Sequence, residues 1–384
     1  MLKNMLHSFG TAFALYAYLS SMPLPPLMGH REARRRLAEA TRSGRLPQVL
    51  LVSGPPGAGK QRLALWLAQL VLCEQQELEP CGKCRHCRLV EGLAFADLHW
   101  FVPIPRPKAA DPDKAIEEAA QALAEVMEER RSKPLYGPPE GMASHAMASV
   151  RLLQRRASLT AVEGGPRIFI LGEAERLVPQ ESSQEAANAL LKLLEEPPPG
   201  SLFILTTVDP RRLLPTIRSR AVPVRLHRLS DADVRAFLQA QLDPPLAPAA
   251  LEQRVAAAAG SIGVALAAGE EVGQAYEAAE QLLVAVLGGR AGIYERALRQ
   301  PPYAARGEFT AMLDALADTL GEAARGVLGQ PTRRPVPRAL LERADAATLL
   351  QALARVAEAR EAAYGNVNPQ ILLAVLGEEL AEVL

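Results

Sequence analysis

The residues with the clearest chemistry form the glycine-rich segment GPPGAGKQ, residues 54–61. The segment follows an apolar run, 49–52, and precedes residues 63–71, whose apolar positions have helical spacing. A strand, a glycine-rich turn and a helix in this order predict a phosphate-binding loop. The glycines let successive backbone N–H groups point into one concavity, and the helix N-terminus adds partial positive charge. The alternative is a structural glycine turn with an incidental lysine. The candidate binding residues are Gly54, Gly57, Gly59, Lys60 and Gln61.

Two positions that hold Mg²⁺ in an active P-loop ATPase carry unsuitable residues. The last loop position, where a Ser or Thr hydroxyl ligates the metal, is Gln61. The strand expected over 168–171 ends in Gly172 and Glu173, where an acidic pair is needed. Glu173 keeps the second acid, and Glu175 is the nearest substitute for the missing first one. We therefore expect a loop that can hold ATP or ADP, binds Mg²⁺ poorly, and hydrolyses nucleotide weakly or not at all.

Two threonines follow the next expected strand, 202–205. A hydroxyl of Thr206 or Thr207 at the tip of that strand could read the γ-phosphate of a nucleotide. The same hydroxyls could equally satisfy a turn at the strand end. Both interpretations stay open at this point.

All four cysteines lie within residues 73–87, in a C-x₇-C-x₂-C-x₂-C arrangement. Four thiolates at this spacing can close a tetrahedral zinc site. Such a site has no vacant position for a substrate, so we expect a structural Zn²⁺. Local clustering argues against a disulfide framework, whereas four free thiols or an iron–sulfur cluster are alternatives. The ligands would be Cys73, Cys81, Cys84 and Cys87.

Length and composition indicate how these residues are positioned. A chain of 384 residues is too long for one ordinary core and suggests two or three domains. Aromatic residues are few while Ala and Leu are abundant, which favours helices. Basic and acidic residues balance at 43 each, so the chain as a whole has no polyanion-binding signature. Any contact with nucleic acid must come from a local patch or from partners.

The N-terminal residues 1–26 predict an extension that is disordered or helical, or a start codon placed too far upstream. Met22 and Met28 are alternative starts. Lys3 and the apolar segment 9–19 weakly resemble a signal peptide but lack a clear cleavage site. No stretch reaches the ~20 apolar residues of a membrane span. We expect a cytoplasmic protein without membrane contact.

Two later regions show different patterns. Residues 106–145 are rich in proline and charge around one helical stretch, 114–131, and we expect an insertion that carries a surface helix rather than a catalytic element. A helix-start signal at Ser230–Asp233 begins a small helical region, and the pattern from 271 to 384 is almost wholly helical.

Four segments together resemble the AAA+ clamp-loader subunits of bacterial DNA polymerase III. They are RLPQVLLVSGPPGAGK (45–60), the four-cysteine module, NALLKLLEEPP (188–198) and TTVDPRRLLPTIRSRA (206–221). The resemblance implies an α/β AAA+ P-loop domain over 27–228, with the zinc module at 73–87 and the insertion at 106–145. It further implies a helical lid domain over 229–270 and an all-α oligomerisation collar over 271–384.

Within that family the chain looks most like the delta-prime type. Gln61, Gly172 and the segment 260–266, which has Gly263 and Val264 where motor subunits have a sensor arginine, distinguish it from the gamma/tau motor. The resemblance implies a non-hydrolysing subunit that helps open the sliding clamp and load it on primed DNA. Its partners would be the gamma/tau and delta subunits, the clamp, and DNA reached through the assembled complex. An active gamma/tau-type motor and a zinc-dependent binding module with a vestigial P-loop are the rival interpretations.

The resemblance also assigns Arg220, in Ser219-Arg220-Ala221. Clamp loaders supply the arginine of this motif in trans to ATP bound by a neighbouring subunit. A guanidinium there neutralises charge that develops on the transferred phosphoryl group. The chain has Ala221 where the family has cysteine, which changes a small neighbour and not the guanidinium. Arg218 is a competing candidate, and either arginine could be a surface ion-pair residue.

Overall fold

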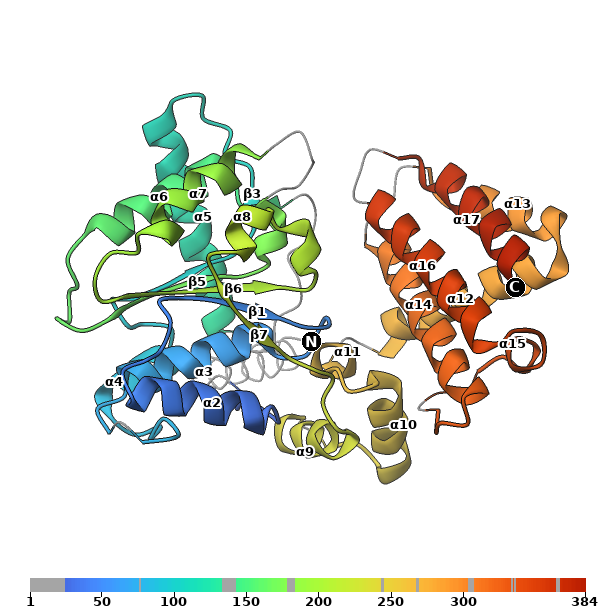
Figure 1. The fold of residues 1–384 in the computed structure, drawn as a ribbon, viewed down its shortest axis with the longest axis horizontal. Coiled ribbons are helices and arrows are strands. Elements are labelled where there is room, and N and C mark those ends of the chain that lie inside the picture. Colours follow the sequence, from blue (N-terminus) through green and yellow to red (C-terminus); the bar gives the residue numbers. More distant parts are fainter. Residues whose placement is uncertain are drawn as a thin grey trace, which may run out of the picture. The chain divides into compact units, whose positions relative to one another are not determined.

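The computed structural model divides after Asp233 into two compact units (Figure 1). It describes residues 25–75, 77–132, 143–177, 184–242, 245–266, 269–302, 307–332, 334, 336–363 and 367–384. The extension expected over 1–26 lies outside the described residues except for its last two. Residues 133–142 of the expected insertion also lie outside them.

A five-stranded parallel sheet in the order β2-β5-β6-β1-β7 forms the centre of the first unit. Every residue of β1, β5 and β6 is buried, as in a parallel sheet covered on both faces. The register pairs Ser53 with Thr207 and Leu171 with Leu205. The carboxyl ends of β1, β5 and β6 therefore meet at one edge. The strands are β1 (Val49–Ser53), β2 (Leu98–Phe101), β5 (Arg167–Leu171), β6 (Ser201–Thr207) and β7 (Val222–Arg225).

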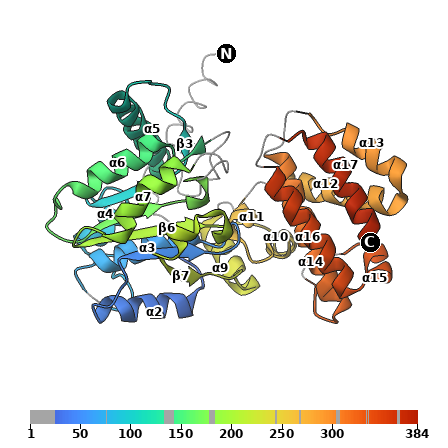
Figure 2. The ribbon, with the colours of Figure 1, turned by 45° about the horizontal axis from the view of Figure 1, so that its top comes forward.

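Helices cover both faces of this sheet. In Figures 1 and 2, α2 and α3 lie on one face, and α5, α6 and α7 lie on the other. A short antiparallel pair, β3 (Ile104–Pro105) and β4 (Ala143–Ser144), lies outside the main sheet. The helices are α2 (Arg31–Arg42), α3 (Lys60–Leu72), α4 (Arg85–Glu91), α5 (Pro112–Ser132), α6 (Met147–Ser158), α7 (Glu185–Glu195) and α8 (Pro215–Arg218), with 3₁₀ turns η1 (Ala174–Leu177) and η2 (Pro210–Arg212).

The helix of the expected insertion is not a surface element alone. Ile116, Ala119 and Leu123 of α5 are buried in the core of the first unit, and Arg130 near its end is only 4% exposed. The spacing i, i+3, i+7 of the first three gives α5 one apolar face, which packs inward. The prediction of a helix here is confirmed, and this helix lies at the surface with one apolar face packed into the core. The charged residues between the apolar ones hid this face.

The second unit is wholly helical in its described residues, as expected for 271–384. Ser230 begins α9 as predicted, because its Oγ accepts the backbone N–H of Asp233 at 3.1 Å. Helix α12 runs across the expected boundary between lid and collar at residue 270, so that division stays a prediction. The helices are α9 (Asp231–Gln241), α10 (Pro248–Ala258), α11 (Ile262–Leu266), α12 (Gly269–Gly288), α13 (Arg290–Leu298), α14 (Glu308–Val327), α15 (Arg338–Arg343), α16 (Ala346–Ala362) and α17 (Pro369–Val383).

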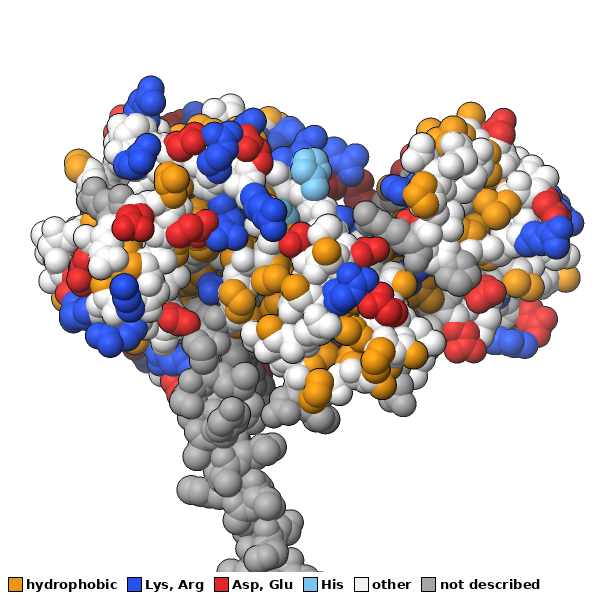
Figure 3. Space-filling model, turned by 90° about the horizontal axis from the view of Figure 1, so that it is seen from below, with side chains coloured by type: hydrophobic (Ala, Val, Ile, Leu, Met, Phe, Trp, Pro, Cys, Tyr) orange, Lys and Arg blue, Asp and Glu red, His pale blue; other side chains and the backbone are white. Residues whose placement is uncertain are grey.

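Surface charge is mixed on the face drawn in Figure 3, where Lys and Arg side chains alternate with Asp and Glu. This agrees with the equal numbers of basic and acidic residues in the chain. In the part of the chain that the structure describes, every helix is too short or too polar to cross a membrane.

Helices α13 and α17 approach closely at Gly377. A Cβ on this residue would lie 2.4 Å from Cγ2 of Ile293, whose β-branched side chain is fully buried. Gly377→Ala should therefore overpack the second unit and lower its free energy of unfolding by about 1–3 kcal/mol. Gly321→Ala on α14 is the matched control, because a Cβ there meets no atom within 4 Å. It should raise the free energy of unfolding by up to about 1 kcal/mol. Urea denaturation followed by circular dichroism measures both, and equal effects would contradict the close approach.

Candidate nucleotide site and cysteine cluster

The phosphate loop connects β1 to α3 in the geometry that its glycines allow. Gly57 and Gly59 have φ angles of 68° and 87°, in the left-handed region that favours glycine. A Cβ on Gly54 would lie 2.7 Å from the carbonyl oxygen of Leu226, the residue that follows β7. All three glycines are therefore needed for the shape of the loop. The loop and the start of α3 form a cradle suited to phosphate oxygens.

A histidine from outside the loop fixes its centre. Nε2–H of His30, just before α2, donates to the carbonyl oxygen of Ala58 at 2.7 Å. Burial lowers the pKa of His30 despite this hydrogen bond. The contact gives the Ala58 carbonyl a hydrogen-bond partner from outside the loop.

Lys60 points back into its own loop. Its Nζ donates to the carbonyl oxygens of Gly54 at 2.9 Å and Pro55 at 2.8 Å. Burial lowers the pKa of Lys60 to about 8, and the carboxylates of Glu175 and Glu173 oppose this shift. The side chain therefore keeps its proton at pH 7. A phosphate entering the loop would replace two contacts to neutral carbonyl oxygens with contacts to charged oxygens.

Gln61 occupies the space that an aspartate at position 172 would fill. A Cβ on Gly172 would lie 3.1 Å from both Cδ and Nε2 of Gln61. Arg130 donates from Nη1 to Oε1 of Gln61 at 3.3 Å. The guanidinium also lies over the ring of Trp100, with its Cζ 4.0 Å from the ring centroid. The place where two metal ligands were expected to be missing is thus filled by an amide and a cation.

The acidic residues after β5 are held by the surrounding backbone and by one arginine. Glu173 has a φ of 53°, which is unfavourable for a residue with a side chain, and its backbone N–H donates to Thr206 Oγ1 at 3.2 Å. Its carboxylate pairs with Arg176 at 2.8 Å. Burial raises the pKa of Glu173, while Arg176, Arg130 and Lys60 hold it down. Glu175 is buried and its Oε1 accepts from the N–H of Val208 at 3.4 Å, while its buried Oε2 has no hydrogen-bond partner among the described residues.

The two candidate threonines both have partners within the chain. Oγ1 of Thr206 accepts the N–H of Glu173, as above, and Oγ1 of Thr207 accepts the N–H of Asp209 at 3.2 Å. Both residues are 1% exposed. These bonds match the turn interpretation of the strand end. A role in reading phosphate stays a prediction.

Arg220 is anchored to α7 and α8. Its Nη2 forms an ion pair with Glu195, and its Nη1 donates to the carbonyl oxygen of Thr216 at 2.7 Å. Its side chain is 29% exposed, and its buried Nε has no hydrogen-bond partner among the described residues. Arg218 is exposed. Among the described residues, the hydrogen bonds of Arg220 do not reach the phosphate loop of its own chain.

The four cysteines come together as their spacing predicted. Their sulfur atoms all lie within 4.8 Å of one another, and Sγ of Cys81 and Cys87 are 3.9 Å apart. Tetrahedral coordination with Zn–S bonds of about 2.3 Å requires sulfur separations of about 3.8 Å, so the cluster fits a single metal ion. Backbone N–H groups donate to three of the sulfurs at 3.3–3.4 Å. Backbone N–H groups of Lys83 and Cys84 lower the pKa of Cys81 to about 6, whereas burial raises the pKa of Cys73 and of Cys87.

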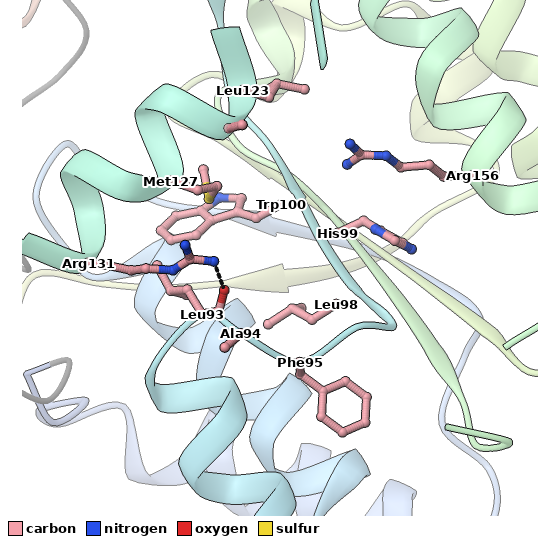
Figure 4. A pocket seen from close by; sticks show the side chains of 11 residues that line it. Leu93, Ala94, Phe95, Leu98, His99, Trp100, Leu123, Met127, Arg131 and Arg156 are labelled. Carbon is pink, nitrogen blue, oxygen red and sulfur yellow. Dashed lines mark hydrogen bonds between the residues drawn. The ribbon is translucent and has the colours of Figure 1, made fainter. Parts of the chain in front are cut away.

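A separate cavity of about 250 Å³ lies beside β2, between α5 and α6 (Figure 4). Trp100, His99 and Arg156 line it, and Arg131 from α5 donates to the carbonyl oxygen of Leu93 at 2.7 Å on its wall. Burial and the charge of Arg156 lower the pKa of His99 to about 4, so that its ring is neutral at pH 7. None of the site residues predicted from the sequence lines this cavity. Trp100 on its wall is the ring on which Arg130 lies, which links the cavity to the phosphate loop.

Comparison with known proteins identifies the family to which the chain belongs. A sequence model of the family described as DNA polymerase III, delta subunit, matches residues 29–230, which is more than half of the chain. The chain belongs to this family of AAA+ clamp-loader proteins. The resemblance stated from the motifs is thereby confirmed.

Individual relatives include both kinds of clamp-loader subunit. The delta′ subunit of Escherichia coli K12 is 30% identical over 234 residues, which cover 60% of this chain and 57% of the relative. The delta′ subunit of Bacillus subtilis 168 is 30% identical over 176 residues, 46% and 41% of the two chains. The gamma/tau subunit of Mycobacterium tuberculosis H37Rv is 30% identical over 227 residues, 59% and 32%. The chain thus matches between about a third and somewhat over half of each relative, and identity alone does not separate the two types.

Sequence reasoning missed residues that complete the site from a distance. Arg130 reaches Gln61 from α5, His30 reaches the loop from before α2, and His145 donates from Nε2 to the carbonyl oxygen of Gly172 at 2.7 Å. Each lies 27–69 positions away from its partner in the chain. The one available signal was that Gln61 and Gly172 both differ from the residues that ligate Mg²⁺ in an active P-loop ATPase. This indicates that other side chains fill the metal position.

Loss of one cysteine should empty the cluster. Cys84→Ser replaces a thiolate by a hydroxyl that binds zinc weakly, so metal content should fall from about one ion per chain to near zero. Elemental analysis of purified protein measures this. His86→Asn is the matched control, because His86 lies beside the cluster but its Nδ1 bonds to the carbonyl of Leu72 at 2.8 Å. Full metal content in Cys84→Ser, or none in the unaltered chain, would contradict the four-thiolate site.

Proposed function

We propose that this chain is a non-hydrolysing subunit of the replicative clamp loader, of the delta-prime type. In that role it helps open the sliding clamp and place it on primed DNA, while neighbouring subunits supply the energy from ATP. The observation that carries this proposal is the packing of Gln61 on Gly172, with the Arg130 guanidinium bonded to the same amide. The corner that holds Mg²⁺ in a motor subunit offers no carboxylate at position 172 and no hydroxyl at position 61.

The partners follow from the family. A clamp loader combines gamma/tau and delta subunits with the clamp, and this chain would reach DNA only through the assembly. Its equal numbers of basic and acidic residues support an indirect contact. The cysteine cluster would hold a structural Zn²⁺ that fastens the end of α3 to the start of α4, because Cys73 ends α3 and Cys84 caps α4. ATP or ADP would occupy the loop without being turned over.

Arg220 would act on ATP bound by a neighbouring subunit. Its ion pair with Glu195 and its bond to Thr216 hold the guanidinium in a defined orientation at the end of α8. An arginine finger contributes most when it is positioned before the reaction, since less rotational freedom is then lost. The exposed Arg218 would have no such positioning.

The helical unit would serve as the oligomerisation collar. Ile371 and Val375 are 62% and 48% exposed and lie four residues apart, so they form an apolar stripe on α17, and Val367, just before this helix, is 39% exposed. Leu298 at the end of α13 is 74% exposed. Its carbonyl oxygen accepts from Nε2 of Gln370, in the first turn of α17, at 3.2 Å. An apolar stripe of this kind fits packing against the helices of neighbouring subunits.

An active motor of the gamma/tau type is the second candidate. It is favoured by one observation, the 30% identity to gamma/tau subunits, which equals the identity to delta′ subunits. The geometry of Gln61 and Gly172 speaks against it.

The finger role predicts an effect on the complex and not on the chain itself. Arg220→Ala should leave folding and assembly intact but lower DNA-stimulated ATP hydrolysis by the reconstituted clamp loader at least tenfold, toward the ~10³-fold seen for other fingers. Arg218→Ala, which removes the same charge two residues away, should change hydrolysis less than twofold. Steady-state phosphate release measures both variants. Equal rates in Arg220→Ala and the unaltered complex would refute the finger role.

Turnover by the isolated chain separates the two candidates. With excess Mg²⁺ and ATP, the purified chain should release phosphate no faster than its Lys60→Met variant, because the site lacks the groups that hold the metal. Hydrolysis that depends on Lys60 and reaches the rate of a motor subunit would replace the proposal with the second candidate.

A further inference from the structure

The corner of the site that would receive a metal ion holds the guanidinium of Arg130. The residue is 4% exposed, its Cζ lies 4.0 Å from the centroid of the Trp100 ring, and its Nη1 donates to Gln61 Oε1 at 3.3 Å. Gln61 occupies the loop position whose side chain ligates Mg²⁺ in an active P-loop ATPase. A permanent cation therefore lies one hydrogen bond away from the expected metal ligand.

The residues at this corner do not fit a divalent cation. The amide oxygen of Gln61 already accepts from Arg130, and Gly172 has no side chain to offer. The carboxylate of Glu173 is paired with Arg176 at 2.8 Å. Mg²⁺ requires near-octahedral oxygen ligands, and a dication beside a buried guanidinium would be repelled.

The rest of the loop does fit a phosphate chain. Its three glycines keep the cradle open, and Lys60 is protonated at pH 7 beside it. Lys60, Arg130 and Arg176 all interact electrostatically with the carboxylate of Glu173, so three cations surround this acid beside the loop. Such a site favours an anion even when no metal accompanies it.

We propose that the guanidinium of Arg130 replaces the divalent cation as the counter-charge for a bound nucleoside polyphosphate, so that this loop binds nucleotide independently of Mg²⁺. A guanidinium carries a fixed charge and donates several hydrogen bonds in a planar fork that matches phosphate oxygens. The inference rests on the proposed function only in taking residues 54–61 as a nucleotide site. It does not involve Arg220 or the collar.

Replacement of the metal ion by a guanidinium also accounts for a loop that binds nucleotide without cleaving it. A metal ion neutralises the phosphates, orients them and bridges the β- and γ-oxygens in the transition state. A guanidinium on a ring-stacked, buried side chain supplies the neutralisation but does not bridge the two phosphates as an ion does. The inference also assigns a function to α5. This helix of the 106–145 segment would position the Arg130 guanidinium beside the phosphate loop.

Nucleotide affinity with and without metal tests the inference directly. The probe is mant-ATP, whose fluorescence reports binding to the full chain, titrated once in excess Mg²⁺ and once in excess EDTA. The two dissociation constants should agree within about threefold. Arg130→Met keeps a long side chain over Trp100 but removes the charge, and it should weaken binding in EDTA at least tenfold, which is about 1.4 kcal/mol.

The neighbouring arginine supplies the matched control. Arg131 lies one position further on α5, and its Nη2 donates to the Leu93 carbonyl while its Nη1 pairs with Glu128. Arg131→Met removes the same charge from the same helix and should leave the affinity within about twofold. Circular dichroism and a thermal melt confirm that each variant is folded.

Three results would overturn the inference. They are a loss of affinity of tenfold or more when EDTA replaces Mg²⁺, equal affinity of Arg130→Met and the unaltered chain, and no binding of mant-ATP in either condition. If Arg130→Met fails to fold, the comparison of Mg²⁺ with EDTA in the unaltered chain still decides. A chain that assembles and depends on Arg220, yet binds mant-ATP only with Mg²⁺, would refute this inference and leave the proposed function standing.

Discussion

The contact between the Gln61 carboxamide and the bare α-carbon of Gly172 is the constraint on which the chemistry of the first unit depends. A Cβ at position 172 would lie 3.1 Å from two atoms of that carboxamide, closer than side chains normally approach. The two positions are therefore coupled by volume: the long amide fits because the neighbouring side chain is absent. An aspartate at position 172 would require the Gln61 carboxamide to move by a few tenths of an ångström. Together the two residues leave this corner without the carboxylate and the hydroxyl that hold Mg²⁺ in an active P-loop ATPase.

The turn after β5 keeps a strained shape although its first acid is missing. Glu173 has a left-handed backbone, which costs of the order of 1 kcal/mol for a residue with a side chain. The hydrogen bond from its N–H to Thr206 and the ion pair with Arg176 hold it there, and His145 bonds to the carbonyl of Gly172 just before it. The architecture that presents two acids to a nucleotide thus persists around one acid.

The elements that could be predicted from the sequence are those whose pattern lies within one short stretch of residues. The runs 49–52, 168–171 and 202–205 were predicted as strands because a strand buried on both faces of a parallel sheet is continuously apolar. The cysteine cluster was predicted because its ligands lie within fifteen residues of one another. Strand β2 at the sheet edge was missed, since its sequence LHWF mixes polar and aromatic residues and only half of it is fully buried.

The residues that could not be predicted are those whose partners are distant in the chain. Arg130 lies among charged residues on α5, and an arginine in such a segment ordinarily faces solvent. Only the folded structure shows that the apolar face of α5 packs inward and carries the end of the helix to Trp100 and Gln61. Two hydrogen bonds from histidines, at Ala58 and Gly172, are invisible for the same reason.

The two cations near the phosphate loop respond differently to their surroundings. Burial lowers the pKa of Lys60 to about 8, so its charge is present at pH 7 and is lost as the pH rises through that value. Arg130 supplies the second cation, and an arginine side chain in general stays charged throughout this range. Lys60 also donates to the carbonyl oxygens of Gly54 and Pro55. Arg130, in contrast, is held by the Trp100 ring and the Gln61 amide, which belong to other elements. A bound ligand must therefore displace the Lys60 ammonium from its two carbonyl partners. The Arg130 guanidinium, in contrast, is already positioned before a ligand binds.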